Sequence, residues 1–251
     1  MNYRIKYTIL FVYLNLSAAG LFAQKIKPEA TEDWSRKPAL VTPAKYGQPP
    51  ADAIVLYSGK KDLDKWEHLD GSPVKWKTKG KALIIEKDAT DIRTKQPFGS
   101  VQMHVEWKTP NPKEDGSNSR GNSGVFLMGL YELQIYESYQ DMSKIYYNGQ
   151  AGSVYKQHIP LVNACLPPQT WQTYDIVFNA PEFNSDKTLK TPAYLTVFHN
   201  NILILNQVAL KGPMKYEGYP EYTYHANKLP ISLQEHDSRV SFRNIWVREL
   251  R

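Results

Sequence analysis

Three polar side chains that could do chemistry lie close together in an otherwise apolar and aromatic stretch: Glu132, Gln134 and Glu137. Alternate residues of a β-strand share a face, so Glu132 and Gln134 lie on one side while Leu133 and Ile135 pack on the other. Glu137 falls on the apolar side unless a β-bulge after Gln134 inserts one residue, and we expect that bulge. Two carboxylates buried on one surface shift each other's pKa, which is typical of a general acid and base.

A strand with a solvated polar face would show the same alternation. The turn at residues 121–124, which contains two glycines, and the flanking aromatic residues favour a functional site over that alternative.

A second polar pair lies about a hundred residues further on. Gln234 and His236 alternate with Leu233, so they share the polar face of a predicted strand over residues 231–236. His236 fits an acid, a base or a group that polarises a carbonyl, although a histidine at a strand end with ordinary partners is equally consistent. The amides of Asn122, Gln134 and Gln234 fit the recognition of hydroxyl groups, because an amide offers both donors and an acceptor.

Weaker substrate-binding candidates are Glu106, His104 and Tyr155. Glu106 and His104 share the polar face of the strand predicted for residues 101–108, where a solvated face is as good an explanation. Tyr155 ends a long tyrosine-rich loop, and loops of that length in a compact domain are often functional.

A divalent cation is left open by the sequence. The side chains of Glu132, Glu137, His104 and His236 are oxygen and nitrogen donors suited to Ca²⁺, Mn²⁺ or Zn²⁺, but they show no compact ligand spacing. No metal ligand is therefore assigned.

The elements that must position these side chains are predicted to be strands. Apolar alternation or short apolar runs bounded by turn residues occur over residues 54–57, 74–78, 83–86, 101–108, 171–179, 193–199, 202–208, 231–236 and 240–247. No segment shows an amphipathic stripe of helical period. We therefore predict an all-β domain of roughly a dozen strands, packed as a two-sheet sandwich.

The first residues predict an export signal. Arg4 and Lys6 precede an apolar stretch of secretory length, and Ala23 offers a cleavage site before Gln24. We expect a signal peptide over residues 1–23, an extended proline-containing leader over 24–51 and a single domain over 52–251. No membrane span is expected after cleavage, and the predicted location is the periplasm or cell surface of a bacterium.

Charge and cysteine content exclude some classes. Without Arg4 and Lys6 the net charge falls from +6 to +4, and the remaining basic residues form no run typical of a nucleic-acid-binding arm. Cys165 is the only cysteine, so the chain has no intrachain disulfide and depends on its core. We expect no nucleic-acid partner; the oligomeric state stays open.

Several motifs together resemble the 3-keto-disaccharide hydrolase family. They follow one another in order along the chain: Gly121–Leu127, Tyr131–Ile135, Gly149–Tyr155, Leu233–His236 and Val240–Val247. The resemblance implies a concanavalin A-like jelly roll with a carbohydrate cleft, and an enzyme that cleaves glycosides already oxidised to a ketone at sugar carbon 3. One departure is visible, because Glu137 stands where many relatives carry Asp, which changes the reach of that carboxylate.

The implied chemistry needs a base, a proton donor and a stabiliser for an enolate. Glu132 and Glu137, with His236, are the residues that could supply these roles. Two alternatives stay open: a retaining glucanase, whose two carboxyl groups lie about 5 Å apart, and a non-catalytic carbohydrate-binding module, which needs no shifted pKa values.

Overall fold

A computed structural model describes residues 26–45, 48–115, 119–140 and 146–250. The chain divides into two compact units, residues 1–40 and 41–251. The described part of the first unit contains one 3-10 turn, η1 (Pro28–Thr31), with no buried residue. The predicted signal peptide lies outside the described residues, and the predicted leader spans the division between the units.

The second unit is built almost entirely of strands. Its short helical segments are η2 (Lys60–Lys65), α1 (Pro112–Asp115) and η4 (Tyr147–Gly149). Its strands are β1 (Ile54–Tyr57), β2 (Trp66–His68), β3 (Lys77–Lys79), β4 (Ala82–Ile84), β5 (Ile92–Phe98), β6 (Val101–Lys108), β7 (Ser123–Leu127), β8 (Tyr131–Ile135), β9 (Gln172–Asn179), β10 (Glu182–Phe183), β11 (Leu189–Thr191), β12 (Tyr194–His199), β13 (Ile202–Ala209), β14 (Leu229–Leu233) and β15 (Ser241–Glu249).

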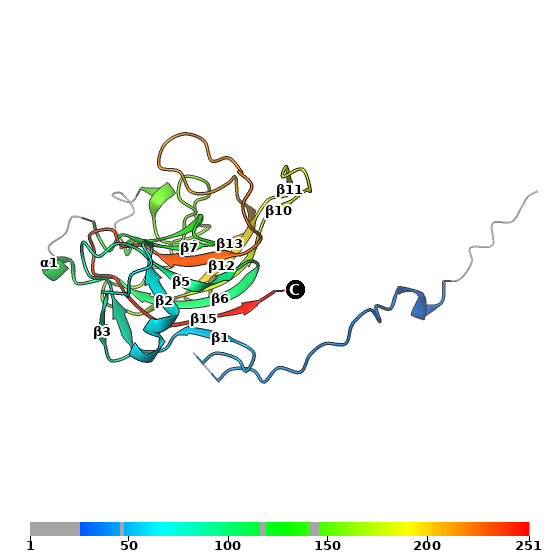
Figure 1. The fold of residues 1–251 in the computed structure, drawn as a ribbon, viewed down its shortest axis with the longest axis horizontal. Helices are drawn as coiled ribbons and strands as arrows, with labels where there is room; N and C mark the ends of the chain where they lie inside the picture. Colours follow the sequence, from blue (N-terminus) through cyan, green and yellow to red (C-terminus); the bar gives the residue numbers. More distant parts are fainter. Residues whose placement is uncertain (1–25, 46–47, 116–118, 141–145, 251) are drawn as a thin grey trace, which may run out of the picture. The chain divides into compact units, whose positions relative to one another are not determined.

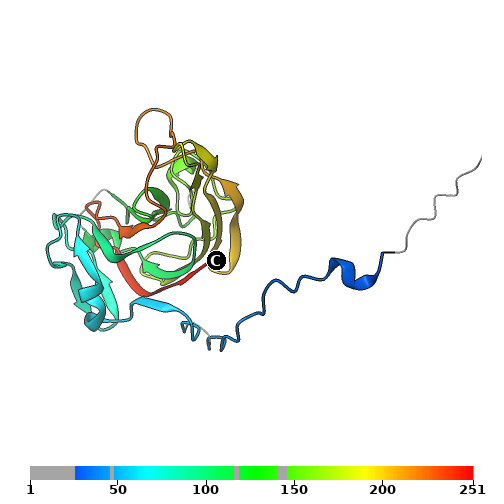
Figure 2. The same cartoon turned by 45° about the vertical axis from the view of Figure 1, so that its right-hand side comes forward.

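Two antiparallel sheets form the body of this unit (Figure 1). The larger, eight-stranded sheet has the order β13-β12-β9-β6-β15-β4-β3, with β1 paired to β15. The smaller, five-stranded sheet has the order β2-β5-β14-β7-β8. Strands far apart in sequence are therefore neighbours, and β15, red in Figure 2, lies beside strands from the first half of the chain.

The core lies between the two sheets and follows from strand alternation. In β6 the side chains of Val101, Met103, Val105 and Trp107 are buried at 1% exposure or less. From the smaller sheet, alternate residues of β7 and β8 complete the same core, among them Val125, Leu133 and Ile135. Each sheet therefore keeps one face in the core and has an outer face turned away from it.

The predicted all-β, two-sheet antiparallel sandwich is confirmed, with fifteen strands among the described residues. Residues 92–98 form a seven-residue strand, β5, which lies between β2 and β14 in the smaller sheet. In the described parts of the chain, no helix has the length and apolar character needed to span a membrane.

Candidate active site on the outer face of the smaller sheet

The register of three strands places two glutamines in one row on the outer face of the smaller sheet. Gln134 of β8 pairs with Gly124 of β7. On the other side of β7, the backbone N–H of Gln234 donates to the Gly124 carbonyl at 3.0 Å. Because neighbouring strands lie about 4.8 Å apart, the two glutamines flank Gly124 on either side. Residues a hundred positions apart in sequence thus share one surface.

The Glu132 carboxyl group occupies the space over Gly124. A Cβ atom at position 124 would lie 2.8 Å from Glu132 Oε1 and 2.9 Å from Phe126 Cε2. Only a residue without a side chain leaves this space free. The glycine therefore lets Glu132 lean from its own row, opposite Phe126, toward the row of Gln134 and Gln234.

Glu132 has the environment of an acid–base group. Its side chain is buried at 4% exposure, and the two groups of effects that act on its pKa, burial and the charge of Asp91, both disfavour the ionised form. Burial, and secondarily the negative charge of Asp91, raise its pKa from 4.5 to about 7. A carboxylate in this state exchanges a proton near neutral pH, which suits general base catalysis.

Asp91 is a site residue that the sequence analysis did not single out. It precedes Ile92, which pairs with Leu233, so Asp91 lies next to Gln234. Its Oδ1 accepts a hydrogen bond from the Glu235 N–H at 2.8 Å, and burial raises its pKa. The only signal in the sequence was a carboxylate just before a strand. Its importance depends on the pairing of β5 with β14, which alternation does not reveal.

His236 lies at the border of the site. Strand β14 ends at Leu233, so the alternation that predicted a shared face for Gln234 and His236 does not extend to His236. The side chain is exposed, and its charge lowers the pKa of Asp91, which places it near that carboxyl group.

Asn122 and Tyr155 border the same surface. The Gln134 amide donates through Nε2 to Asn122 Oδ1 at 2.7 Å, which fixes the orientation of both amides. Burial, neighbouring tyrosines and the Glu132 charge raise the pKa of Tyr155, so its phenol lies within electrostatic reach of Glu132. The backbone of residues 152–153 exchanges two hydrogen bonds with Gln134, which fixes the loop carrying Tyr155 to the edge of β8.

The predicted role of Glu137 is not supported, because the expected β-bulge is absent. The register between β7 and β8 is continuous from Leu127↔Tyr131 to Ser123↔Ile135, and β8 ends there. The Glu137 carboxylate accepts hydrogen bonds from the Thr109 hydroxyl at 2.7 Å and from the Tyr139 N–H at 2.9 Å. Since Thr109 follows β6 of the larger sheet, Glu137 is turned toward that sheet rather than toward Glu132.

The structure does not bring Glu106 and His104, the weaker substrate-binding candidates, together with Glu132. Both alternate with core residues of β6, so they lie on the outer face of the larger sheet, with the core between them and Glu132. His104 Nδ1 lies 2.7 Å from Asp175 Oδ1, and Glu106 accepts hydrogen bonds from Arg243 and Asn244. Alternation predicted which side of the strand these residues share, but not which sheet contains it.

The four side chains considered as metal donors do not come together. In the described segments no three His, Cys, Asp or Glu side chains are arranged to hold a metal ion. Glu132 and His104 are separated by the core. The Glu137 carboxylate accepts hydrogen bonds from Thr109 and Tyr139. The residues present therefore do not fit a metal site built from this set.

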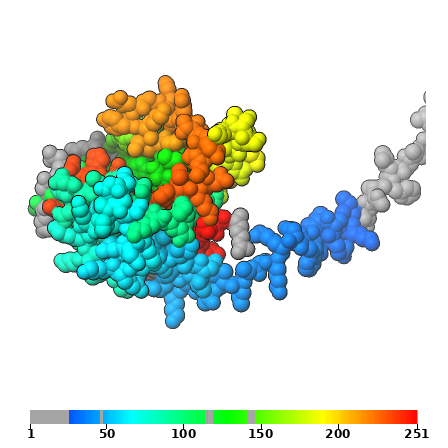
Figure 3. Space-filling model, viewed as in Figure 1, coloured from blue at the N-terminus to red at the C-terminus, as the bar shows by residue number. Residues whose placement is uncertain are grey.

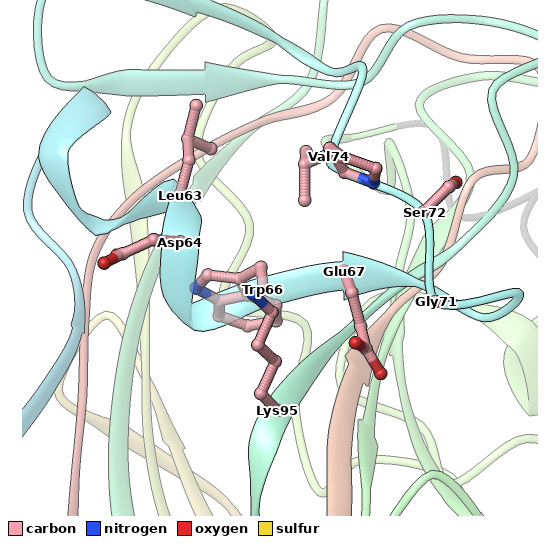
Figure 4. A pocket seen from close by; sticks show the side chains of 9 residues that line it. Leu63, Asp64, Trp66, Glu67, Gly71, Ser72, Val74 and Lys95 are labelled. Carbon is pink, nitrogen blue, oxygen red and sulfur yellow. The ribbon is translucent and has the colours of Figure 1, made fainter.

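A cavity of about 220 Å³ lies at the β2 edge of the smaller sheet, across the sheet from β8 (Figure 4). Its lining includes Trp66, Glu67, Val74 and Lys95. A second cavity of about 270 Å³ adjoins Thr109 and Asp115. Neither is lined by Glu132, Gln134 or Gln234.

Comparisons with known proteins point to one family. A family model described as "3-keto-alpha-glucoside-1,2-lyase-like domain" matches residues 52–248. The chain is 41% identical to a protein from Parabacteroides distasonis ATCC 8503 whose crystal structure is described as that of "a putative glycosyl hydrolase"; 90% of this chain and 97% of that one are covered, with a TM-score of 0.81. Two further structures with that description from the same organism share only the fold. They are 19% and 18% identical, with TM-scores of 0.59 and 0.51, and cover 80% and 79% of this chain and 94% and 99% of their own. No curated protein matches the chain.

Proposed function

The chain belongs to the 3-keto-alpha-glucoside-1,2-lyase-like family, and we propose that it cleaves glycosides whose sugar carries a ketone at carbon 3, with Glu132 as the general base. The family and the 41%-identical relative support a carbohydrate-active protein of glycosyl hydrolase type. The observation that carries the finer proposal is the Glu132 carboxyl group, which is buried over Gly124 beside Gln134 and has its pKa raised to about 7.

The proposed reaction begins at sugar carbon 2. A ketone at carbon 3 acidifies the hydrogen on carbon 2, and Glu132 takes that proton. The electron pair left on carbon 2 forms the double bond to carbon 1 as the bond from carbon 1 to the leaving oxygen breaks. Addition of water to the resulting enone completes a net hydrolysis. A base with a pKa near the working pH is efficient in such a step.

The leaving oxygen needs a proton, and Asp91 is the proposed donor. Two carboxyl groups that interact electrostatically can hold one proton between them, so that one serves as the base and the other as the acid. For this step the shared proton resides on Asp91 while Glu132 is ionised, and burial makes that arrangement easier to reach because it raises the pKa of Asp91. His236, which lies near Asp91, assists by replacing the proton from solvent.

Amides and hydroxyls next to Glu132 provide substrate recognition. Because Gln134 Nε2 is committed to Asn122, its carbonyl oxygen is presented to a sugar hydroxyl. Gln234 faces it across Gly124 and offers a second amide. Both glutamines thereby hold the sugar ring over the carboxyl group of Glu132.

The proposal is tested with the variant Glu132→Gln. A glutamine keeps the shape of glutamate but cannot take a proton, so kcat on a 3-keto-glucoside should fall about 10²- to 10⁴-fold. The matched control is Glu67→Gln, because Glu67 lies on the same outer face at the far strand, paired with Arg93 at 2.9 Å. The kcat of this control on the 3-keto-glucoside should stay within about threefold of that of the parent protein.

Two substrates, assayed with and without chelator, distinguish the alternatives. Turnover of the unoxidised glucoside with none of the keto sugar would favour a retaining glucanase, although that mechanism lacks a second carboxylate from Glu137 in this structure. Binding of both sugars without turnover of either would favour a binding module. Full activity of Glu132→Gln would reject Glu132 as the base.

A further inference from the structure

A cluster of tyrosine side chains lies near Glu132, at the β8 edge of the smaller sheet. Residues 152 and 153, just before Tyr155, exchange two backbone hydrogen bonds with Gln134, and the Tyr155 ring meets that of Tyr146 edge-on, with 6.5 Å between centroids. The Lys156 ammonium lies 5.3 Å from the centre of the Tyr155 ring and 4.5 Å from that of Tyr216. These contacts join four residues into one cluster, here called the tyrosine rim: Tyr146, Tyr155, Lys156 and Tyr216. Tyr155 is the member of the rim that interacts electrostatically with Glu132.

The rim is built from two loops that are joined by hydrogen bonds. Lys156 Nζ donates to the Tyr216 carbonyl at 2.6 Å, and Gln157 exchanges hydrogen bonds with the backbone of Lys211 and Gly212 at 2.7 and 3.0 Å. His158 adds a contact of 2.8 Å to the Ala209 carbonyl. These contacts hold the loop over residues 211–228, orange in Figure 3, against the loop that carries Tyr155.

The local backbone is shaped to bring these rings together. Lys156 has a φ of 58°, a left-handed conformation that is uncommon for a residue with a side chain. Gly149 lies so close to the rings that a Cβ atom there would be 2.9 Å from Tyr146 Cδ1 and 3.2 Å from Tyr155 Cε2. A backbone held in this way against the rings is typical of a functional loop rather than a chance surface.

The rim keeps its outer rings open to solvent. Tyr146 is 55% exposed and Tyr216 is 70% exposed, although both belong to the ordered arrangement around Lys156. Tyrosine rings offer a flat apolar face together with a polar hydroxyl, which suits a ligand that is itself flat and partly polar. In the proposed function the oxidised sugar lies on the outer face of the sheet over Glu132. The leaving group on carbon 1 is then the part of the substrate that can extend over these rings.

We propose that the tyrosine rim is the subsite for the leaving group and that it selects leaving groups containing a ring with an apolar face. Such a ring is either a second sugar or an aromatic aglycone, and both would lie against Tyr146 and Tyr216. A leaving group without a ring, such as methanol from a methyl glycoside, gains nothing from the rim. The inference rests on the proposed function, since it assumes that the sugar itself occupies the surface at Glu132.

The test compares three 3-keto-glucosides: 3-keto-trehalose, a 4-nitrophenyl 3-keto-glucoside and a methyl 3-keto-glucoside. The variants are Tyr146→Ala and Tyr216→Ala, and the matched control is Tyr219→Ala, a tyrosine of the same loop that is 87% exposed. Loss of one stacking ring should lower kcat/KM about three- to tenfold for ring-bearing substrates, mainly through KM. The methyl glucoside and the Tyr219→Ala control should be unaffected, and an unchanged methyl rate also shows that the variants fold.

The substrates separate the two kinds of ring. A loss confined to the nitrophenyl substrate identifies an aromatic aglycone, and a loss confined to 3-keto-trehalose identifies a second sugar. Equal effects on all three substrates, or no effect on any, would overturn the leaving-group subsite while leaving the role of Glu132 intact. If no substrate is turned over, the proposed function fails, and calorimetric affinities decide the subsite alone: equal affinity of the parent protein for nitrophenyl and methyl glucosides would reject it.

Discussion

Burial, and secondarily the charge of the neighbouring Asp91, raise the pKa of the Glu132 carboxyl group to about 7. The unfolded chain has no such environment, and there the pKa returns to 4.5. The folded state therefore holds a proton that the unfolded state loses between these two values. The stability contributed by Glu132 is full below pH 4.5 and is lost as the pH rises through about 7.

The variant Glu132→Gln removes this pH dependence. At pH 8 it should be more stable than the parent by on the order of 3 kcal/mol, from a pKa shift of 4.5 to about 7 at about 1.36 kcal/mol per unit. At pH 4 the two proteins should be equally stable. Urea unfolding at both pH values measures the difference, and a variant that is equally or less stable at pH 8 would contradict the assigned pKa.

Gly124 provides a second test at the scale of single residues. A methyl group in Gly124→Ala would lie 2.8 Å from Glu132 Oε1, and the carboxyl group is the flexible end that can move away. We expect kcat on a 3-keto-glucoside to fall at least tenfold while the far-ultraviolet circular dichroism stays unchanged, because a base displaced by about 1 Å loses much of its effect. Unchanged kcat would show that the base does not depend on its position over Gly124.

Only some residues of the candidate active site could be predicted from the sequence, because only some of their positions depend on local structure. Glu132 and Gln134 could be assigned to one face because strand alternation is local. Glu137 could not, because its orientation depends on whether β8 continues or bulges, and β8 ends at Ile135. Asp91 was missed because its place beside Gln234 follows from the pairing of β5 with β14, which connects segments about 140 residues apart.

At the scale of elements, the outer face of the larger sheet has its own polar cluster. His104 of β6 bonds Asp175 of β9, while Glu106 of β6 bonds Arg243 of β15, so the cluster joins three adjacent strands. Burial alone would lower the pKa of His104, but the hydrogen bond to Asp175 and the carboxylate charge of Glu106, 3.7 Å from Nε2, raise it to about 9. These side-chain contacts connect neighbouring strands of the larger sheet. The core separates them from Glu132.

We predict that His104→Phe lowers stability without changing catalysis. Phenylalanine keeps the ring that stacks on Trp246 at 5.3 Å but loses the charged bonds, which should lower the unfolding free energy by about 2 kcal/mol at pH 7. Because the His104 pKa is raised from 6.5 to about 9, this stabilisation is full below pH 6.5 and is lost as the pH rises through about 9.

Thermal unfolding at pH 6, 8 and 10 measures this effect. The difference from the parent should shrink at pH 10, and kcat/KM at 25 °C should match that of the control Lys108→Gln on the same strand and face. A large loss of activity in His104→Phe at 25 °C would return His104 to the candidate active site.

At the scale of the whole molecule, the fold class was predictable because hydrophobic alternation repeats in strand after strand. The assignment of strands to two sheets was not, since β15 pairs with β1, β4 and β6 from the first half of the chain. That topology decides which polar faces belong to the candidate site and which lie on the other side of the core. It explains why strand alternation alone could not show that His104 and Glu132 lie on different sheets.

The same scale gives a prediction about the first forty residues. The core residues lie between Leu56 and Val247, so the core is supplied by the second unit alone. Terminal segments that add no residue to a core contribute little to folding free energy. A chain beginning at residue 41 should therefore unfold within about 2 °C of one beginning at residue 24 and should keep its kcat/KM. Differential scanning calorimetry of the two chains measures the shift. A Tm lowered by more than about 5 °C, on the order of 1–2 kcal/mol for a domain of this size, would show that residues 24–40 stabilise the sandwich in solution.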